Sequence, residues 1–217
     1  MHPWRIRPDR IGHRDGQVLV IGITGGVGAG KSRILQILKE EYHAQILLAD
    51  EVAAEQEEPG KEGYRLLVEC FGEGILQADG RLDRGAFAEL IFKDEKALGQ
   101  VNAIIHPLTW QALCERVERL AGQAAGEELL IAVEAALFDE QSRGLCDTLW
   151  FVDTSEENRI RRLMENRGYT RKKCLSIIRN QLCREEFLAL ADAVIDNNGT
   201  VAEVREQIAW LLSRERG

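Results

Sequence analysis

The sequence predicts an α/β fold with a mostly parallel sheet. Short apolar runs rich in β-branched residues, such as QVLVIGIT at 17–24, show no alternation of polar and apolar residues, which is typical of strands buried on both faces. Along the chain these runs alternate with segments whose apolar residues recur at helical spacing. A glycine-rich turn joins the first predicted strand to the first predicted helix.

The remaining elements of this fold follow from the same two patterns. Further buried strands are expected at 44–49, 129–133, 148–153 and 192–196. Helices are expected at about 31–42, 155–167 and 170–188, and from Val201 toward the C-terminus. The strand and helix segments together predict one α/β core.

Residues 60–125 have a different pattern and predict a helical lobe inserted in this core. They are mostly helical, with a turn at Asp79-Gly80. Pro107 interrupts a helical apolar period, and proline costs about 3 kcal/mol inside a helix, so we expect it to start a helix or to kink one. Residues 1–16 carry four arginines and no apolar signal segment, which predicts a flexible N-terminal arm before a folded domain at 17–217.

The composition limits the classes of function. The chain has 217 residues, 45% of them hydrophobic and 29% charged, as in ordinary globular proteins. A net charge of −8 argues against general binding to nucleic acid or to a membrane surface, and no apolar run approaches the length of a membrane span. The five cysteines are scattered without a CxxC pair, which indicates reduced thiols in a cytosolic protein.

The glycine-rich turn matches the phosphate-binding motif GxxxxGK[ST] in its required context between a buried strand and a helix. The motif consists of Gly25, Gly26, Val27, Gly28, Ala29, Gly30, Lys31 and Ser32. Glycines turn backbone N–H groups toward phosphate oxygens, and the helix N-terminus adds positive charge. We expect Lys31 to neutralise the β- and γ-phosphates and Ser32 to bind Mg²⁺. A plain glycine turn is the alternative, which eight matched positions disfavour.

The rest of the sequence narrows the class of nucleotide-binding protein. A regulatory GTPase needs an NKxD motif that this chain lacks, and a motor ATPase needs a longer chain. A small-molecule kinase fits the size. Asp50 follows the second predicted strand, where ligands of open α/β sheets bind, and a carboxylate there can accept the proton of a substrate hydroxyl. An N-cap for a helix starting at Glu51 explains Asp50 equally well.

A basic segment after the fourth strand predicts a lid. Residues 159–173 contain seven basic residues against one acidic residue. A solvated helical face is the usual explanation of such a run. Its concentration in an acidic chain and its position instead favour arginines that close over a triphosphate.

Motifs along most of the chain resemble those of dephospho-coenzyme A kinases. They are GGVGAGKS at 25–32, LLADEVA at 47–53, EPG at 58–60, FGEGILQADGRLDR at 71–84, IF at 91–92, VNAIIHP at 101–107, Gln181 and ADAVIDNNG at 191–199. The resemblance covers about 17–212. It implies a P-loop kinase core with a five-stranded parallel sheet, a helical substrate lobe and a lid at 155–188. It also implies ATP-dependent phosphorylation of the ribose 3′-hydroxyl of dephospho-coenzyme A, the last step of coenzyme A synthesis.

The resemblance assigns roles to single residues. Asp50 matches the catalytic base, and Glu134 matches an acidic residue that holds a Mg²⁺-bound water, although a plain strand-end carboxylate is the alternative. Arg162 matches the lid arginine best and Arg167 second. Asn197 lies in the segment that borders the adenine.

In the lobe, the resemblance points to Tyr64, Arg84 and His106 as substrate-binding residues. Tyr64 is otherwise a core aromatic and Arg84 a surface arginine. His106 precedes proline, which favours an extended backbone, and its alternative is a core histidine bonded to the backbone.

The chain departs from the family pattern at three places: Leu48 replaces the first aspartate of DxD, Arg33 stands beside Ser32 where threonine is usual, and Ala136 replaces a proline. None removes a group that the reaction needs, and Arg33 joins the expected nucleotide-binding residues. The expected protein is cytoplasmic, uses ATP and Mg²⁺, and is a monomer or weak homo-oligomer. A different small-molecule or nucleotide kinase, or a nucleotide-binding module without catalysis, are the alternatives.

Overall fold

The computed structural model describes residues 17–124 and 126–215. The predicted arm at 1–16 lies outside the described residues. The described chain forms two compact units. The first unit contains the residues up to Leu47 and those from Ala121 onward, and the second contains Leu48–Leu120. The second unit begins earlier than the lobe expected at 60–125, because it includes the helix that follows the second strand.

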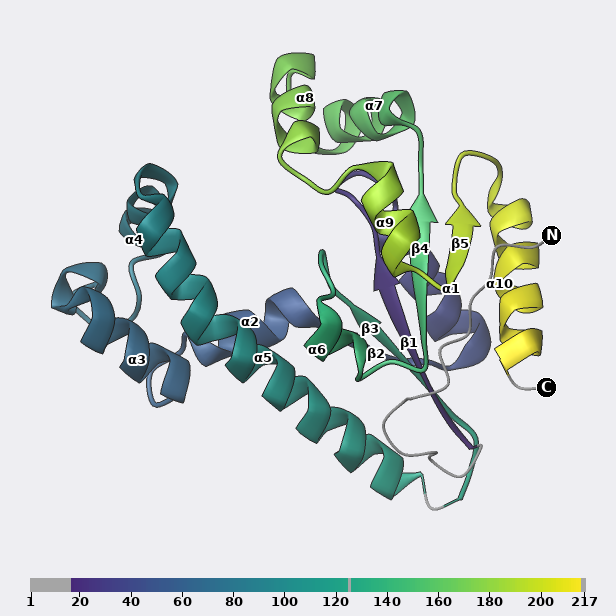
Figure 1. Cartoon of the computed structure of the whole chain (residues 1–217), viewed down its shortest axis with the longest axis horizontal. Helices are drawn as coiled ribbons and strands as arrows, with labels where there is room; N and C mark the ends of the chain where they lie inside the picture. The colour runs from purple at the N-terminus through teal and green to yellow at the C-terminus, as the bar shows by residue number, and fades with distance from the viewer. Residues whose placement is uncertain (1–16, 125, 216–217) are drawn as a thin grey trace. The chain divides into compact units, whose positions relative to one another are not determined.

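The core of the first unit is a five-stranded sheet within the described residues (Figure 1). Its strands are β1 (Val18–Thr24), β2 (Gln45–Leu48), β3 (Leu129–Glu134), β4 (Thr148–Asp153) and β5 (Ala193–Asp196). They lie in the order β2-β3-β1-β4-β5, and β1 runs parallel to β3 and β4, as β4 does to β5. The α/β class and all five strand segments predicted from the sequence are confirmed. These strands are continuous apolar runs because a parallel sheet is covered by helices on both faces, so that side chains on both sides of each strand are buried.

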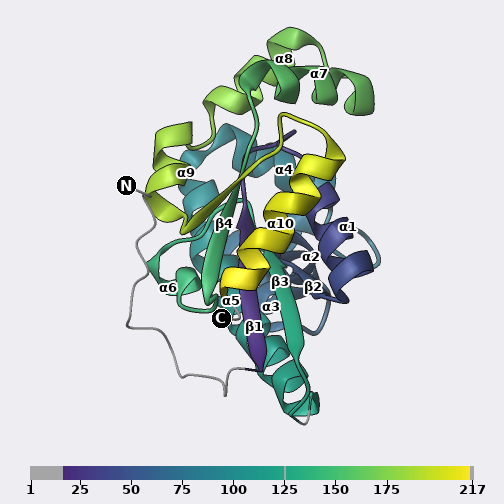
Figure 2. The same cartoon turned by 90° about the vertical axis from the view of Figure 1, so that its right-hand side faces the viewer.

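Helices enclose this sheet. In the first unit they are α1 (Lys31–Tyr42), α6 (Glu140–Arg143), α7 (Glu156–Arg167), α8 (Arg171–Arg179), α9 (Arg184–Leu190) and α10 (Val201–Glu215). Helix α1 contacts β3, α9 contacts β4 and α10 contacts β5. Figure 2 shows α1 and α9 on opposite sides of the sheet. Helix α1, predicted at about 31–42, buries Ile34, Leu35, Ile37 and Leu38 on one face.

The single helix expected at 170–188 is wrong, because the structure has α8 and α9 with a turn between them. Asn180 caps the C-terminus of α8. Cys183 is the N-cap of α9, and its backbone N–H donates to the Glu186 carboxylate at 2.7 Å, as in a capping box. The break frees Gln181 from helical packing, so that its side chain can reach the phosphate loop.

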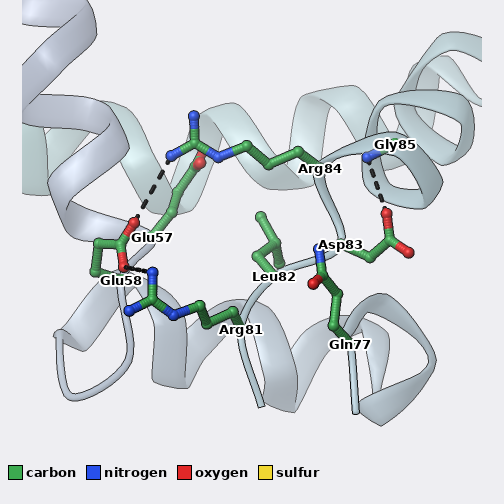
Figure 3. A pocket seen from close by; sticks show the side chains of 8 residues that line it. All are labelled: Glu57, Glu58, Gln77, Arg81, Leu82, Asp83, Arg84 and Gly85. Atoms are coloured by element: carbon green, nitrogen blue, oxygen red, sulfur yellow. Dashed lines mark hydrogen bonds and ion pairs between the residues drawn. The ribbon is translucent and has the colours of Figure 1, made fainter. Parts of the chain in front are cut away.

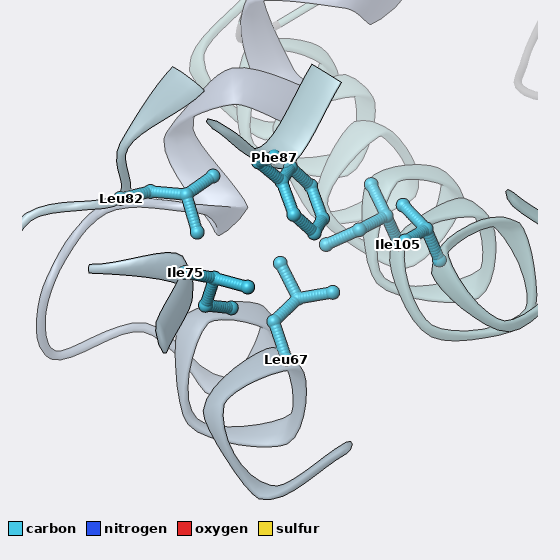
Figure 4. Close-up of a cluster of buried hydrophobic side chains, with 6 residues drawn as sticks. Leu67, Ile75, Leu82, Phe87 and Ile105 are labelled. Atoms are coloured by element: carbon cyan, nitrogen blue, oxygen red, sulfur yellow. The ribbon is translucent and has the colours of Figure 1, made fainter. Parts of the chain in front are cut away.

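The second unit is helical around its own small core. Its elements are α2 (Ala49–Gln56), α3 (Glu62–Phe71), the short 3₁₀ helix η1 (Glu73–Ile75), α4 (Arg84–Lys93) and most of α5 (Glu95–Gln123). The core consists of Leu67, Ile75, Leu82, Phe87, Val101 and Ile105, part of which Figure 4 shows. The turn predicted at Asp79-Gly80 is present, and Gly80 has a φ of 79°.

The expectation that Pro107 starts a helix is wrong, because α5 runs through it from Glu95 to Gln123. The missing proline N–H costs one helical hydrogen bond. The buried stripe of α5, with Ile105 and Thr109 on either side of Pro107, offsets this cost through packing. The Thr109 hydroxyl also donates to the Ile105 carbonyl oxygen at 2.8 Å.

Leu67 tests the core of the second unit. Leu67 is fully buried in that cluster, so Leu67→Ala should lower the free energy of unfolding by about 3 kcal/mol through lost burial and a residual cavity. Leu98→Ala is the matched control, because the Leu98 side chain is 41% exposed. Urea denaturation checks both variants. Equal, small losses would contradict the packing described here.

Candidate active site

The phosphate loop joins β1 to α1 at the centre of the sheet, because β1 lies between β3 and β4. Ligands of open α/β sheets bind beyond the carboxyl ends of such strands. Gly28 and Gly30 have φ values of 78° and 93°, a region that favours glycine. Gly30 is also the N-cap of α1 and has no side chain to occupy the first backbone N–H groups of the helix. The loop therefore leaves a helix N-terminus suited to phosphate.

Lys31 lies at the start of α1 and points back along the loop. Its Nζ donates to the Gly25 carbonyl oxygen at 2.9 Å and lies 3.2 Å from Oε1 of Glu134. The parallel register sets Glu134, the last residue of β3, beside Ile23 of β1. Both side chains are 16% exposed. A cation and a carboxylate are thus held together at the carboxyl ends of two adjacent strands.

The Ala29 carbonyl oxygen is the anchor of the second half of the loop. It accepts hydrogen bonds from Thr154 Oγ1 at 2.8 Å, Arg162 Nη1 at 2.9 Å and Asn197 Nδ2 at 2.7 Å. Arg162 Nη2 also donates to the Asn197 carbonyl oxygen at 2.8 Å. A Cβ on Gly30 would clash with Asn197 Nδ2, so glycine is required there for a second reason. Segments far apart in the sequence thereby hold one loop.

Arg162 is therefore at the phosphate loop, where the sequence predicted a lid arginine. Burial lowers the pKa of Arg162, and the nearby charges of Arg161 and Arg33 lower it further. The three guanidinium groups concentrate positive charge beside the loop. A bound anion would relieve this repulsion.

Of the other predicted nucleotide-binding side chains, Ser32, Arg33 and Arg167 are exposed and Asn197 is buried. Ser32 and Arg33 lie on the exposed part of the first turn of α1. Arg167 is exposed in the last turn of α7, a position that favours a cation through the helix dipole. Asn197 is 4% exposed, and its side chain bonds to the loop, a contact that the sequence did not indicate.

Asp50 lies in the first turn of α2 in the second unit. The alternative that Asp50 caps a helix starting at Glu51 is wrong, because α2 begins at Ala49 with Leu48 as its N-cap. The Asp50 side chain is exposed. Its carboxylate is thus left available for a ligand by the local structure.

Tyr64 and Arg84 lie in the second unit. The Tyr64 hydroxyl donates to the Gly80 carbonyl oxygen at 2.5 Å, which ties α3 to the turn before α4. Arg84 is the first residue of α4, and its Nη2 lies 3.8 Å from Oε1 of Glu58. The Tyr64 hydroxyl is thus engaged within the lobe, and Arg84 is exposed with a loosely held partner, so its guanidinium can also reach a ligand.

His106 lies within α5 and is exposed. The expectations of an extended backbone and of a core histidine are both wrong. Packing of the long helix overrides the local preference of the residue before proline.

A pocket of about 260 Å³ opens beside Arg84 within the second unit (Figure 3). Its lining consists of Glu57, Glu58, Gln77, Arg81, Leu82, Asp83, Arg84 and Gly85. Burial raises the pKa of Glu57, and the charge of Glu58 adds to this, while Arg84 partly opposes it. Arg81 also reaches the Glu58 carboxylate, at 3.9 Å. The pocket is therefore polar, with both signs of charge at its walls.

Sequence reasoning missed two residues that hold the loop. Thr154 follows β4 directly, and its position after a strand end was the available signal. Arg159 was counted in the basic segment but given no role, and its Nε donates to the Val27 carbonyl oxygen at 2.9 Å. Both contacts depend on tertiary structure.

The parallel sheet with β1 at its centre, and the glycine loop that leads from β1 to Lys31 at the start of α1, define a P-loop nucleotide-binding protein of the kinase type. A family model described as dephospho-CoA kinase matches residues 19–203. A dephospho-CoA kinase of Carboxydothermus hydrogenoformans is 34% identical over 195 residues, covering 90% of this chain and 93% of that protein. The chain belongs to the dephospho-CoA kinase family.

Two solved structures share this fold. The crystal structure of TT1252 from Thermus thermophilus matches with a TM-score of 0.75 and 30% identity, covering 92% of this chain and 98% of that one. Dephospho-CoA kinase from Campylobacter jejuni matches with a TM-score of 0.64 over 91% of this chain and 96% of that one; at 18% identity this shows the fold alone.

Membership of this family identifies the reaction. Dephospho-CoA kinases use ATP to phosphorylate dephospho-CoA to coenzyme A in the last step of coenzyme A biosynthesis, so this chain is a phosphotransferase acting on a small molecule. The resemblance seen in the sequence is confirmed. No helix in the described part of the chain combines the length and apolar character that a membrane span requires.

Proposed function

We propose that this chain carries out the family reaction through the residues assigned above. The γ-phosphoryl group of ATP passes to the ribose 3′-hydroxyl of dephospho-CoA. The proposal rests mainly on the position of Lys31, whose ammonium group is held at the N-terminus of α1 by the Gly25 carbonyl and the Glu134 carboxylate. When a triphosphate occupies the loop, the Lys31 ammonium exchanges the Gly25 carbonyl for phosphate oxygens and neutralises their charge.

Nucleotide binding is assigned to the whole loop. Its backbone N–H groups surround the phosphates, with Arg33 and Arg167 adding positive charge and Asn197 bordering the base. The motif residues are Gly25, Gly26, Val27, Gly28, Ala29, Gly30, Lys31 and Ser32. Arg162 is the catalytic lid cation in this proposal, because charge develops on the transferred group and Arg162 lies at the loop.

Asp50 is the proposed general base. Its exposed carboxylate, in the first turn of α2, accepts the proton of the 3′-hydroxyl as the oxygen attacks phosphorus. The bond from the γ-phosphorus to the bridging oxygen breaks, and ADP leaves with the electron pair. Tyr64, Arg84 and His106 belong to the proposed substrate lobe at 60–125 and bind the acceptor there.

Mg²⁺ is the proposed metal. Mg²⁺ prefers oxygen ligands and keeps several waters, so the Ser32 hydroxyl and the Glu134 carboxylate suit it as a direct ligand and as a water-bridged one. Held by these two residues, the ion would supply positive charge next to the phosphate oxygens. The proposal also includes a lid at 155–188, a cytoplasmic location and a monomer or weak homo-oligomer.

Acceptor-dependent ADP release tests the reaction. The protein is incubated with ATP and Mg²⁺, with and without dephospho-CoA, and the product is identified by mass spectrometry. We expect a gain of one phosphate on dephospho-CoA. A nucleoside monophosphate or another acceptor phosphorylated in its place, or ATP binding with no acceptor-dependent ADP, would overturn the proposal.

A further inference from the structure

Arg159 joins three separate parts of the first unit at Val27 of the phosphate loop. From α7, its Nε donates to the Val27 carbonyl oxygen at 2.9 Å, and its Nη2 donates to Oε1 of Gln181 at 2.7 Å. The same Oε1 accepts the Val27 backbone N–H at 3.0 Å. The backbone N–H and C=O of Val27 are therefore both hydrogen-bonded to side chains, and these two side chains are hydrogen-bonded to each other.

The guanidinium group of Arg159 also lies directly against Gly26. A Cβ on Gly26 would clash with Nη2 of Arg159 and would lie 2.5 Å from its Cζ. A Cβ on Gly28 would be 3.0 Å from the Arg159 carbonyl oxygen. The loop is thus in close contact with the side chain and the backbone of Arg159, and the glycines leave the room that this contact requires.

The charge of Arg159 has neutral hydrogen-bond partners in the described part of the chain, the Val27 carbonyl and the Gln181 amide oxygen. Burial lowers the pKa of Arg159, and the charges of Glu156 and Asp153 only partly oppose this. A half-buried cation with neutral partners is costly to place in a fold unless its position serves another group. Beside a phosphate loop, that group is the anionic nucleotide.

We infer that Arg159 and Gln181 are positioning residues that hold Gly26 and Val27 in the ATP-binding conformation of the phosphate loop. They hold the backbone of Val27 and do not contact the transferred phosphoryl group. The fork of the guanidinium is essential, since one arm holds the loop and the other holds Gln181. The inference needs ATP binding at the loop and does not depend on which acceptor is phosphorylated.

Titration of ATP with Mg²⁺ tests this inference directly, without an acceptor. Arg159→Met and Gln181→Met each remove one of the two side chains that hold Val27, together with the hydrogen bond between them. Each should weaken ATP binding by about tenfold to a hundredfold, the usual effect of losing hydrogen bonds that involve a charged group. The double variant should bind ATP only slightly more weakly than either single variant, because both substitutions release the backbone of the same residue, Val27. Arg205→Met is the matched control, an exposed arginine on α10 that pairs with Glu41 and has no assigned role at the loop.

Kinetics and a conservative variant separate positioning from a merely structural role. The KM for ATP should rise with the dissociation constant, while kcat at saturating ATP stays within about threefold, since the chemical groups are unchanged. Arg159→Lys keeps the charge but lacks the fork, so it should not restore affinity. Recovery by lysine, additive losses in the double variant, an effect equal to that of Arg205→Met, or lost kcat at unchanged KM would each overturn the inference. A wild-type protein that binds ATP without phosphorylating dephospho-CoA would contradict the proposed reaction and leave this result intact.

Discussion

Lys31→Met is expected to lower kcat by about 10³-fold while the protein remains folded, because removing one preorganised cationic donor from developing phosphate charge costs on this order. The Lys31 ammonium lies 2.9 Å from the Gly25 carbonyl oxygen and 3.2 Å from Glu134 at the head of α1. Methionine preserves the length of the side chain but carries no charge. The loss should appear in kcat and in ATP affinity together, since the proposed contact of Lys31 with the phosphates exists both in the bound ATP and in the transition state.

The matched control for this variant is Lys39→Met, a lysine in the last turn of the same helix. Lys39 is exposed. Steady-state kinetics with dephospho-CoA as the acceptor measure both variants, and thermal unfolding confirms that both fold. Turnover by Lys31→Met at the level of Lys39→Met would refute the assignment of Lys31 to the phosphates.

Asp50→Asn is expected to lower kcat by about 10²–10⁴-fold with little change in the KM for ATP, because the variant removes the proton acceptor and leaves the nucleotide site intact. Asparagine has nearly the same shape as aspartate. Leu48, and not Asp50, is the N-cap of α2, so the substitution removes no capping hydrogen bond. The cost to the helix is limited to a weaker interaction with its dipole, about 0.3–1 kcal/mol.

Glu51→Gln isolates that dipole effect. Glu51 is the next residue in the same first turn, is also acidic and is exposed. The two variants should therefore have similar stability in urea denaturation and very different kcat values. Similar kcat values in the two variants would mean that another group accepts the proton.

Much of the fold could be predicted because its strands are buried on both faces. Burial on both faces demands an unbroken apolar run, which local sequence displays directly, as at Val18–Thr24. Pro107 and the segment 170–188 were misjudged for the opposite reason. Packing of α5 outweighs a local proline penalty, and the turn between α8 and α9 is stabilised by contacts that local periodicity does not contain.

The candidate site divides in the same way. The phosphate loop and its lysine were predicted because the motif is contiguous, and glycine spacing alone specifies the backbone conformation that it needs. Thr154, Arg159 and the side chain of Asn197 were not given their contacts with the loop. Each lies more than 120 positions away from the loop residue that it contacts.

The sequence by itself determined the α/β class, the order of the strands along the chain and the identity of the phosphate loop, because these depend on burial patterns and backbone preferences over a few neighbouring residues. Only the tertiary structure decided that β1 lies between β3 and β4, which sets Glu134 beside the loop and within reach of Lys31. It also decided that Ala29 and Val27 are held by side chains from α7 and from the segments after β4, β5 and α8. Strand order and long-range hydrogen bonds depend on packing the whole sheet, and no local stretch of sequence contains that information.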